Sequence, residues 1–125
     1  MKATGLDHLV LTVKSVERSI QFYSDVLGME AVTFDENRRA LRFGDQKVNL
    51  HEAGKEFEPK AEQPLPGSAD LCFLVEGKVL EHLQSLNVSV LVGPIVRTGA
   101  RGRLESVYIR DPDGNLLELS KHLAV

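Results

Sequence analysis

The sequence predicts an α+β protein made of two paired β-α-β-β-β modules, whose curved sheets form a cup. Two observations indicate this fold class: an amphipathic helical pattern follows the first strand pattern, and the same order of patterns occurs twice in 125 residues. A third observation is the turn Asp-Pro-Asp-Gly-Asn at residues 111–115, which reverses the chain before a last strand. We expect a single domain over residues 1–125, with module one at about 5–53, a linker at about 54–67 and module two at about 68–122.

Module one begins with a strand at residues 6–13, where the two-residue period puts His8, Val10 and Thr12 on one face. A helix over residues 16–27 follows, because apolar residues recur at helical spacing and Gly28 suits a C-cap. Three further strands are predicted at residues 29–35, 39–43 and 47–52.

The linker is polar, contains three prolines and shows no periodicity. Module two then repeats the order, with a strand at residues 68–75, a helix at 78–86 and strands at 88–96, 104–110 and 116–121. The repeat gives His8 and Asp70 comparable positions in the two first strands. It also places Asn49 and His51 opposite Glu118 in the two last strands.

Composition excludes several classes of function. A charged fraction of 26% with a net charge of -3 argues against a nucleic-acid-binding surface. The single cysteine, Cys72, excludes an internal disulfide, and neither a signal peptide nor a membrane span is evident. We therefore expect a cytoplasmic protein without nucleic-acid or membrane partners.

Polar residues on the predicted strand faces are candidates for a metal site. Imidazole and carboxylate ligands together suit Zn, Fe, Mn, Co or Ni. Each residue also has a plain structural explanation: His8 as a core histidine, Asp70 as a cap, and His51 and Glu118 as solvent-facing side chains. Their matched positions in two modules favour the metal site.

Other residues are candidates for substrate binding. Arg97 and Arg101 lie in a glycine-containing segment that predicts either a flexible loop recognising an anionic substrate or a solvated turn. Tyr108 and Arg110 face either the cup or solvent. Cys72 is expected to be a small core residue and not a nucleophile.

The chain resembles the vicinal oxygen chelate superfamily, which includes glyoxalase I, bleomycin-resistance proteins and extradiol dioxygenases. The resemblance covers nearly the whole chain, and its motifs lie at residues 6–13, 19–29 and 111–115 with Glu118. Further segments are similar to the glyoxalase domain-containing protein 5 group: residues 43–52, 54–61, 66–72 and 97–100.

The resemblance implies a homodimer that holds one divalent metal per site, either Zn, Ni, Co, Mn or Fe. It implies His8 and Glu118 as ligands, and a third ligand at Asp70, where histidine is common. The fourth strand offers His51 or Asn49; the working set is His8, His51 and Glu118, with Asp70 as fourth ligand or supporting partner. Glu118, His51 or Asp70 would transfer protons, and Asn49 is a further candidate for contacting substrate.

The function that the resemblance implies is a metal-dependent enzyme acting on a small, possibly anionic molecule, as an isomerase, lyase or thiol transferase. One alternative is an extradiol-type iron dioxygenase. Another is a non-catalytic protein of the bleomycin-resistance type that sequesters a ligand. A degenerate cup that serves only as an interaction scaffold is the remaining hypothesis.

Overall fold

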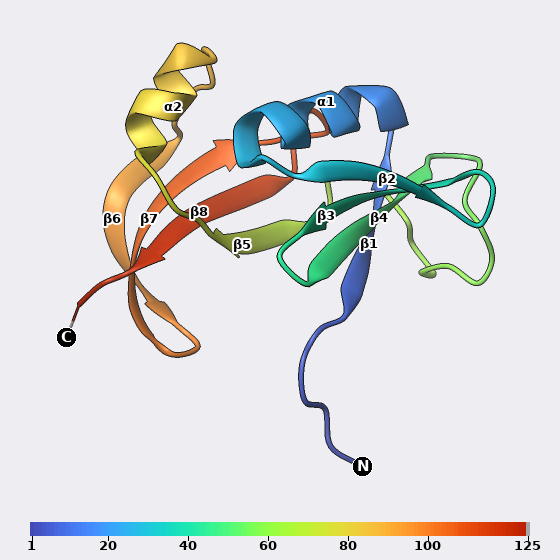
Figure 1. Cartoon of the computed structure of the whole chain (residues 1–125), viewed down its shortest axis with the longest axis horizontal. Helices are drawn as coiled ribbons and strands as arrows, with labels where there is room; N and C mark the ends of the chain where they lie inside the picture. Colours follow the sequence, from blue (N-terminus) through green and yellow to red (C-terminus); the bar gives the residue numbers. More distant parts are fainter. Residues whose placement is uncertain (125) are drawn as a thin grey trace. The chain divides into compact units, whose positions relative to one another are not determined.

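A computed structural model describes residues 1–124 and divides the chain into two compact units, Met1–Pro66 and Gly67–Val125. Each unit contains four strands and one helix in the order β-α-β-β-β (Figure 1). The predicted fold class and the repeated order of elements are therefore confirmed.

Unit 1 is a four-stranded sheet with one helix. Its strands follow the order β1-β4-β3-β2; β1 and β4 are parallel and the other neighbours antiparallel. The elements are β1 (His8–Val13), α1 (Val16–Leu27), β2 (Glu30–Phe34), β3 (Arg38–Phe43) and β4 (Gln46–Glu52). The predicted ranges agree with these bounds to within two residues at each end.

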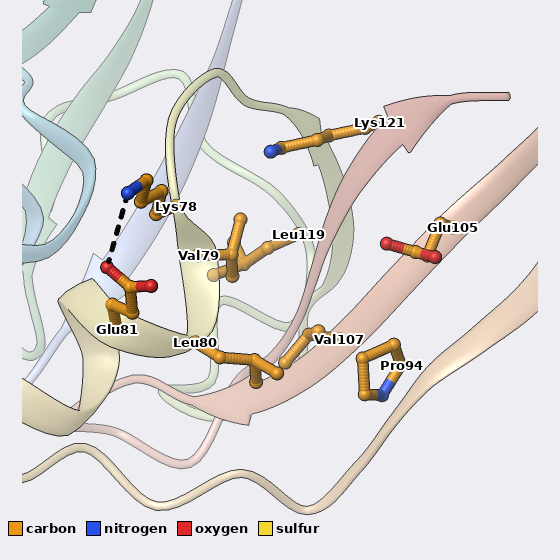
Figure 2. Close-up of a pocket in the computed structure, with 9 residues that line it drawn as sticks. All are labelled: Lys78, Val79, Leu80, Glu81, Pro94, Glu105, Val107, Leu119 and Lys121. Carbon is orange, nitrogen blue, oxygen red and sulfur yellow. Dashed lines mark ion pairs between the residues drawn. The ribbon is translucent and has the colours of Figure 1, made fainter. Parts of the chain in front are cut away.

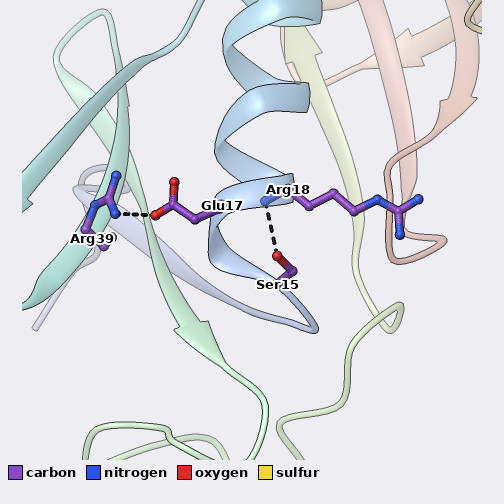
Figure 3. A network of polar contacts seen from close by, with 4 residues as sticks. All are labelled: Ser15, Glu17, Arg18 and Arg39. Atoms are coloured by element: carbon purple, nitrogen blue, oxygen red, sulfur yellow. Dashed lines mark hydrogen bonds and ion pairs between the residues drawn. The ribbon is translucent and has the colours of Figure 1, made fainter.

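Local sequence determines where α1 begins and ends. Ser15 has extended backbone and its hydroxyl accepts a hydrogen bond from the Arg18 amide at 3.2 Å, as an N-cap does (Figure 3). Gly28 ends the helix at φ 65°, a left-handed conformation that glycine adopts without strain. Tyr23 and Val26 are buried on the inner face of α1.

The two faces of the unit 1 sheet differ in chemistry. Arg39 on β3 pairs with Glu17 on α1 at 2.6 Å, which identifies the face next to the helix (Figure 3). Apolar core residues share that face by strand alternation: Leu11, Val13, Leu41, Val48 and Leu50. The opposite face carries His8, Asn49 and His51, so the sequence-predicted candidates of this unit lie together on one face.

Unit 2 repeats this sheet topology with the order β5-β8-β7-β6. Its elements are β5 (Asp70–Leu74), α2 (Val79–Ser85), β6 (Val92–Gly99), β7 (Gly102–Arg110) and β8 (Leu116–His122). The parallel pair β5 and β8 again lies at one side of the sheet, and Cys72 is opposite Glu118.

The predicted strand at 88–96 is displaced in the structure. Residues after α2 complete the helix end, where Asn87 has φ 56° and the Val88 amide donates to the Leu83 carbonyl at 2.9 Å. Pairing with β7 therefore begins only at Val92, which lies opposite Tyr108.

The segment around Arg97 and Arg101 is a β-hairpin and not a flexible loop. β6 continues through Arg97 to Gly99, which pairs with Gly102, so only Ala100 and Arg101 form the turn. Of the two alternatives predicted for this segment, the structure shows the turn between strands, because the glycines belong to the last pair of the ladder. None of the helices described over residues 1–124 is long and apolar enough to cross a membrane.

Candidate functional site

His8 presents one ring nitrogen to its surroundings. Its Nδ1 is 2.8 Å from the Asp7 carboxylate, and its side chain is 42% exposed. Because a carboxylate accepts, this contact favours a proton on Nδ1 and leaves the Nε2 lone pair available. A histidine oriented by a carboxylate in this way is common among metal ligands.

Asn49 carries a buried oxygen without a partner. The residue is 5% exposed, and its Oδ1 has no hydrogen bond within residues 1–124. It lies opposite Val10 on β1 and Ala40 on β3. An unpaired buried acceptor costs free energy, so this oxygen is a natural point for a ligand or a cation to bind.

His51 is buried and occupied by protein contacts. Its Nε2 is 3.4 Å from a guanidinium nitrogen of Arg38, and the Phe57 ring packs edge-on with centroids 5.6 Å apart. A guanidinium can only donate, so Nε2 is the unprotonated nitrogen. Burial lowers the pKa of His51, as does the charge of Arg38, while the carboxylates of Glu56 and Glu58 raise it.

The strand register separates the two histidines. His8 lies opposite Lys47, whereas His51 lies opposite Thr12, four residues further along. At roughly 3.3 Å per residue this is about 13 Å along the strands, too far for two side chains perpendicular to a sheet to bind one ion. The register places Asn49 closer to His8, and so favours Asn49 over His51 as its companion.

Glu118 in unit 2 is held by hydroxyl groups. Its Oε2 accepts hydrogen bonds from the Ser106 hydroxyl at 2.6 Å and from the Ser120 hydroxyl at 3.4 Å. Ser106 and Ser120 are fully buried, and their oxygens are 2.7 Å apart. One carboxylate oxygen is thereby fixed, and Oε1 is left to bind something else.

Cys72 and Asp70 lie on the same strand face as Glu118. The Cys72 sulfur is 3.3 Å from the Ser120 hydroxyl, and the residue is exposed, so the expectation of a core cysteine was wrong. Burial of the sulfur raises the pKa of the Cys72 thiol, the Ser120 hydrogen bond lowers it, and Glu118 and Asp70 raise it. A raised thiol pKa disfavours the reactive thiolate, which supports the prediction that Cys72 is not a nucleophile. Asp70 is exposed, opposite Leu116.

The predicted substrate-binding residues of unit 2 contact one another or nearby groups. Tyr108 lies opposite Glu118, and its hydroxyl accepts from the Arg97 Nε at 3.2 Å. Arg110 donates to the Gly114 carbonyl at 3.3 Å, and Arg101 is 3.3 Å from the His122 ring. Tyr108 is therefore the one whose strand position is adjacent to Glu118.

The donor set can be compared with what a divalent metal requires. The predicted ligands divide two and two: His8 and His51 in unit 1, and Asp70 and Glu118 in unit 2. Within residues 1–124 no three His, Cys, Asp or Glu side chains gather in one place. In each unit, however, an oriented donor is present: His8 Nε2, on the same sheet face as the Asn49 oxygen, in unit 1, and Glu118 Oε1 in unit 2. Imidazole, amide and carboxylate donors fit a borderline or hard divalent ion.

A pocket of about 220 Å³ lies on the other face of the unit 2 sheet, beneath α2 (Figure 2). Val79, Leu80, Val107 and Leu119 form its apolar part, and Lys78 and Glu81 form an ion pair of 3.9 Å at its rim. It contains none of the predicted site residues, since Leu119 and Lys121 alternate with Glu118 and Ser120 along β8.

Sequence reasoning missed the side chains that hold the candidates in place. Ser106 and Ser120 could have been found, because each lies on a predicted strand at a position that alternation places beside Glu118. Arg38 and Phe57 could not, because adjacent Arg38 and Arg39 face opposite ways and Phe57 lies in a segment without periodicity.

Two β-α-β-β-β units with polar donors on one sheet face define a protein of the vicinal oxygen chelate fold. A family model described as "Glyoxalase/Bleomycin resistance protein/Dioxygenase superfamily" matches residues 5–119, so the chain belongs to this superfamily.

Two curated relatives are similar over most of their length. Virulence protein STM3117 of Salmonella typhimurium is 53% identical over 121 residues, which cover 94% of this chain and 84% of the relative. Its crystal structure has a TM-score of 0.96 at 52% identity, with 98% of this chain and 100% of that chain covered. Glyoxalase domain-containing protein RDO1 of Mycosarcoma maydis is 50% identical over 125 residues, covering 98% of this chain and 70% of the relative.

More distant proteins differ in their named activities. Catechol-2,3-dioxygenase of Bacillus subtilis is 26% identical, and the match covers 93% of this chain but 41% of the enzyme. Lactoylglutathione lyase of Agrobacterium tumefaciens shares the fold, with a TM-score of 0.71, 23% identity and coverage of 97% and 96%. TnmS3, an antibiotic-binding protein of Streptomyces sp. CB03234, does so with a TM-score of 0.74, 20% identity and coverage of 98% and 99%.

Proposed function

We propose that the protein is a metal-dependent enzyme of the vicinal oxygen chelate type acting on a small molecule. The observation that carries this proposal is that two side chains able to bind a metal are held in position by hydrogen bonds. His8 is oriented by Asp7, and Glu118 is held through one oxygen by Ser106 and Ser120. Such supporting contacts are typical of side chains that bind a metal.

The proposed ligands are His8, Glu118 and Asn49, with Asp70 as a fourth ligand or a supporting partner. Asn49 replaces His51 in this set because of the strand register and because the His51 nitrogen already faces Arg38. A divalent metal at these residues would supply Lewis acidity to a substrate with two adjacent oxygens.

The remaining residues would bind and orient the substrate. Tyr108, fixed by Arg97, offers a hydroxyl beside the strand position of Glu118. Asp70 is exposed and able to accept a proton from a bound molecule, whereas His51 is buried. This arrangement suits isomerase, lyase or thiol-transferase chemistry.

The iron dioxygenase hypothesis is less well supported. Its usual site needs two histidines and one carboxylate on one ion. The register of β1 and β4 separates His8 from His51, so unit 1 does not offer such a pair.

A metal-free ligand-binding protein is the second candidate. The observation in its favour is that Asp70 occupies the position where the family resemblance leads us to expect a histidine ligand. The fold of the antibiotic-binding protein TnmS3 is compatible with this function. Such a protein would bind its ligand without turnover and without stoichiometric metal.

Metal content tests the proposal. Protein purified without chelator is expected to contain about one divalent metal per site, and His8→Ala and Glu118→Ala are each expected to lose it, since each removes a prepared donor. Elemental analysis by mass spectrometry provides the measurement.

His82→Ala, on α2, and Glu105→Ala, on the other face of β7, are matched controls that should retain the metal. If His8→Ala and Glu118→Ala both retain the full amount of metal, the assignment of these residues as metal ligands is contradicted. Absence of metal from the wild type, together with saturable ligand binding, would favour the sequestering protein.

A further inference from the structure

Two cations in unit 1 lie against aromatic rings and not against carboxylates. The Arg38 guanidinium carbon is 5.3 Å from the centroid of the Phe34 ring and 4.7 Å from that of Phe57. The Lys47 Nζ is 3.8 Å from the Phe34 centroid. Across residues 1–124 neither cation forms an ion pair with an acidic side chain.

The lack of an acidic partner distinguishes Arg38 from the other two arginines of β3. Arg39 pairs with Glu17 at 2.6 Å, and Arg42 pairs with Glu30 at 3.4 Å. Both Arg38 and Lys47 are half-buried, so their charges are less well solvated than those of exposed side chains. A partly desolvated cation without a counter-ion has a strong preference for an anion.

Two acidic side chains near His51 already have other partners. Glu56 and Glu58 are close enough to influence His51, but Glu56 accepts from the Gly54 amide at 2.8 Å and Glu58 pairs with Lys60 at 2.6 Å. Neither carboxylate forms an ion pair with Arg38 or Lys47.

The contacts of Arg38 leave some of its guanidinium N–H groups available to donate hydrogen bonds to a ligand. The rings of Phe34 and Phe57 lie within cation–π distance of its guanidinium, and His51 receives a single Nη2 hydrogen at 3.4 Å. The other guanidinium hydrogens can pair with two oxygens of a planar or tetrahedral oxyanion. Contacts with two aromatic rings also hold the side chain, so little rotamer entropy is lost when an anion binds.

We propose that Phe34, Arg38, Lys47, His51 and Phe57 form a binding site for an oxyanion group, either carboxylate or phosphate, of a small ligand. We call these five residues the Arg38 patch. The proposal requires neither a bound metal nor turnover. A net charge of -3 on the chain makes the patch a local exception to an overall anionic protein.

The test is a titration with inorganic phosphate followed by nuclear magnetic resonance, with ionic strength held constant by sodium chloride. Saturable shifts are expected at the Arg38 side-chain Nε–H and the Lys47 amide, and Arg38→Gln is expected to weaken binding at least tenfold. Arg39→Gln is the matched control, because it removes the same charge from the adjacent residue, which lies on the opposite face and pairs with Glu17 (Figure 3), and it should retain the wild-type Kd. A parallel titration with acetate distinguishes carboxylate from phosphate as the preferred group.

Equal affinities in wild type and Arg38→Gln, or shifts that grow linearly without saturation for both anions, would overturn the proposal. If Arg38→Gln does not fold, Lys47→Gln replaces it, with Lys55→Gln as control. Repeating the titration on His8→Ala separates the two proposals: phosphate binding should persist there although metal is lost, and its disappearance would contradict an independent site.

Discussion

At the scale of single residues, the structure changes the role that we propose for His51. Its ring is buried at 3% exposure, with Arg38 at one nitrogen and Phe57 against its plane. These contacts assign it to the Arg38 patch in our proposals, while Asn49 takes its place beside His8. The two proposals thus give Asn49 and His51, two residues of one strand, separate roles on the same sheet face.

The lowered pKa of His51 predicts a pH-dependent stability. Below the ordinary value of 6.5 the unfolded chain binds a proton that the folded protein resists. The free energy of unfolding should therefore fall as pH decreases from about 6.5 towards the folded pKa, by at most about 1.4 kcal/mol per pH unit. Urea unfolding of wild type and His51→Gln between pH 7 and 5 measures the difference.

His51→Gln cannot take up this proton, so its stability should decline less over the same interval. His122→Gln, which alters an exposed histidine near Arg101, is the control and should follow the wild type. Parallel curves for wild type and His51→Gln would show that the burial of this ring is not linked to folding.

At the scale of elements, the turn between β7 and β8 is a polar structure linked to the start of unit 2. The Asp111 carboxylate accepts from the Asp113 and Asn115 amides at 2.9 Å each and from the Asn115 side chain at 2.8 Å. Asn115 Oδ1 in turn accepts from the Ala69 amide at 2.9 Å. The turn thus connects the residue before β5 with the residue before β8.

Removal of the Asn115 side chain should destabilise the protein. Asn115 is 1% exposed, and its truncation removes the hydrogen bond to the Ala69 amide and the one to the Asp111 carboxylate, at about 1–3 kcal/mol for each lost bond in a buried site. We expect Asn115→Ala to lower the free energy of unfolding by roughly 2–4 kcal/mol, as measured by denaturant titration. Asn37→Ala, in an exposed turn, should change it by no more than about 0.5 kcal/mol. Similar values for both variants would contradict a structural role for this network.

Some elements were predictable because their signals are local. Ser15 and Gly28 determine the ends of α1, and period-two patterns locate β1 and β8. The start of β6 was not predictable, because Val88 and Val90 have strand propensity but the chain completes the end of α2 first. The site is predictable to a similar extent. Strand alternation places Ser120 on the same face as Glu118, but the choice between Asn49 and His51 depends on the register of β1 with β4, which the local sequence does not reveal.

At the scale of the whole molecule, we expect a homodimer. Large apolar side chains remain more than a third exposed in unit 2, which is unfavourable in water. They include Leu80, Leu86, Leu91, Val92 and Val96. Sedimentation velocity at micromolar concentration should show a single species of twice the chain mass of 13.8 kDa. A monomer with metal still bound would refute any version of the site that is shared by two subunits.

The position of β5 in its sheet has a consequence for how the chain can fold. In the order β5-β8-β7-β6, β5 hydrogen-bonds to β8 and to no other described strand, and β8 is the last of the described strands in sequence. During synthesis about 46 further residues, from Asp70 to Leu116, must therefore be added before β5 can pair with β8. Until then the edge of β5 is exposed and can pair with a wrong strand. A chain that stops before Leu116 would keep every element of unit 1 and still leave β5 permanently unpaired.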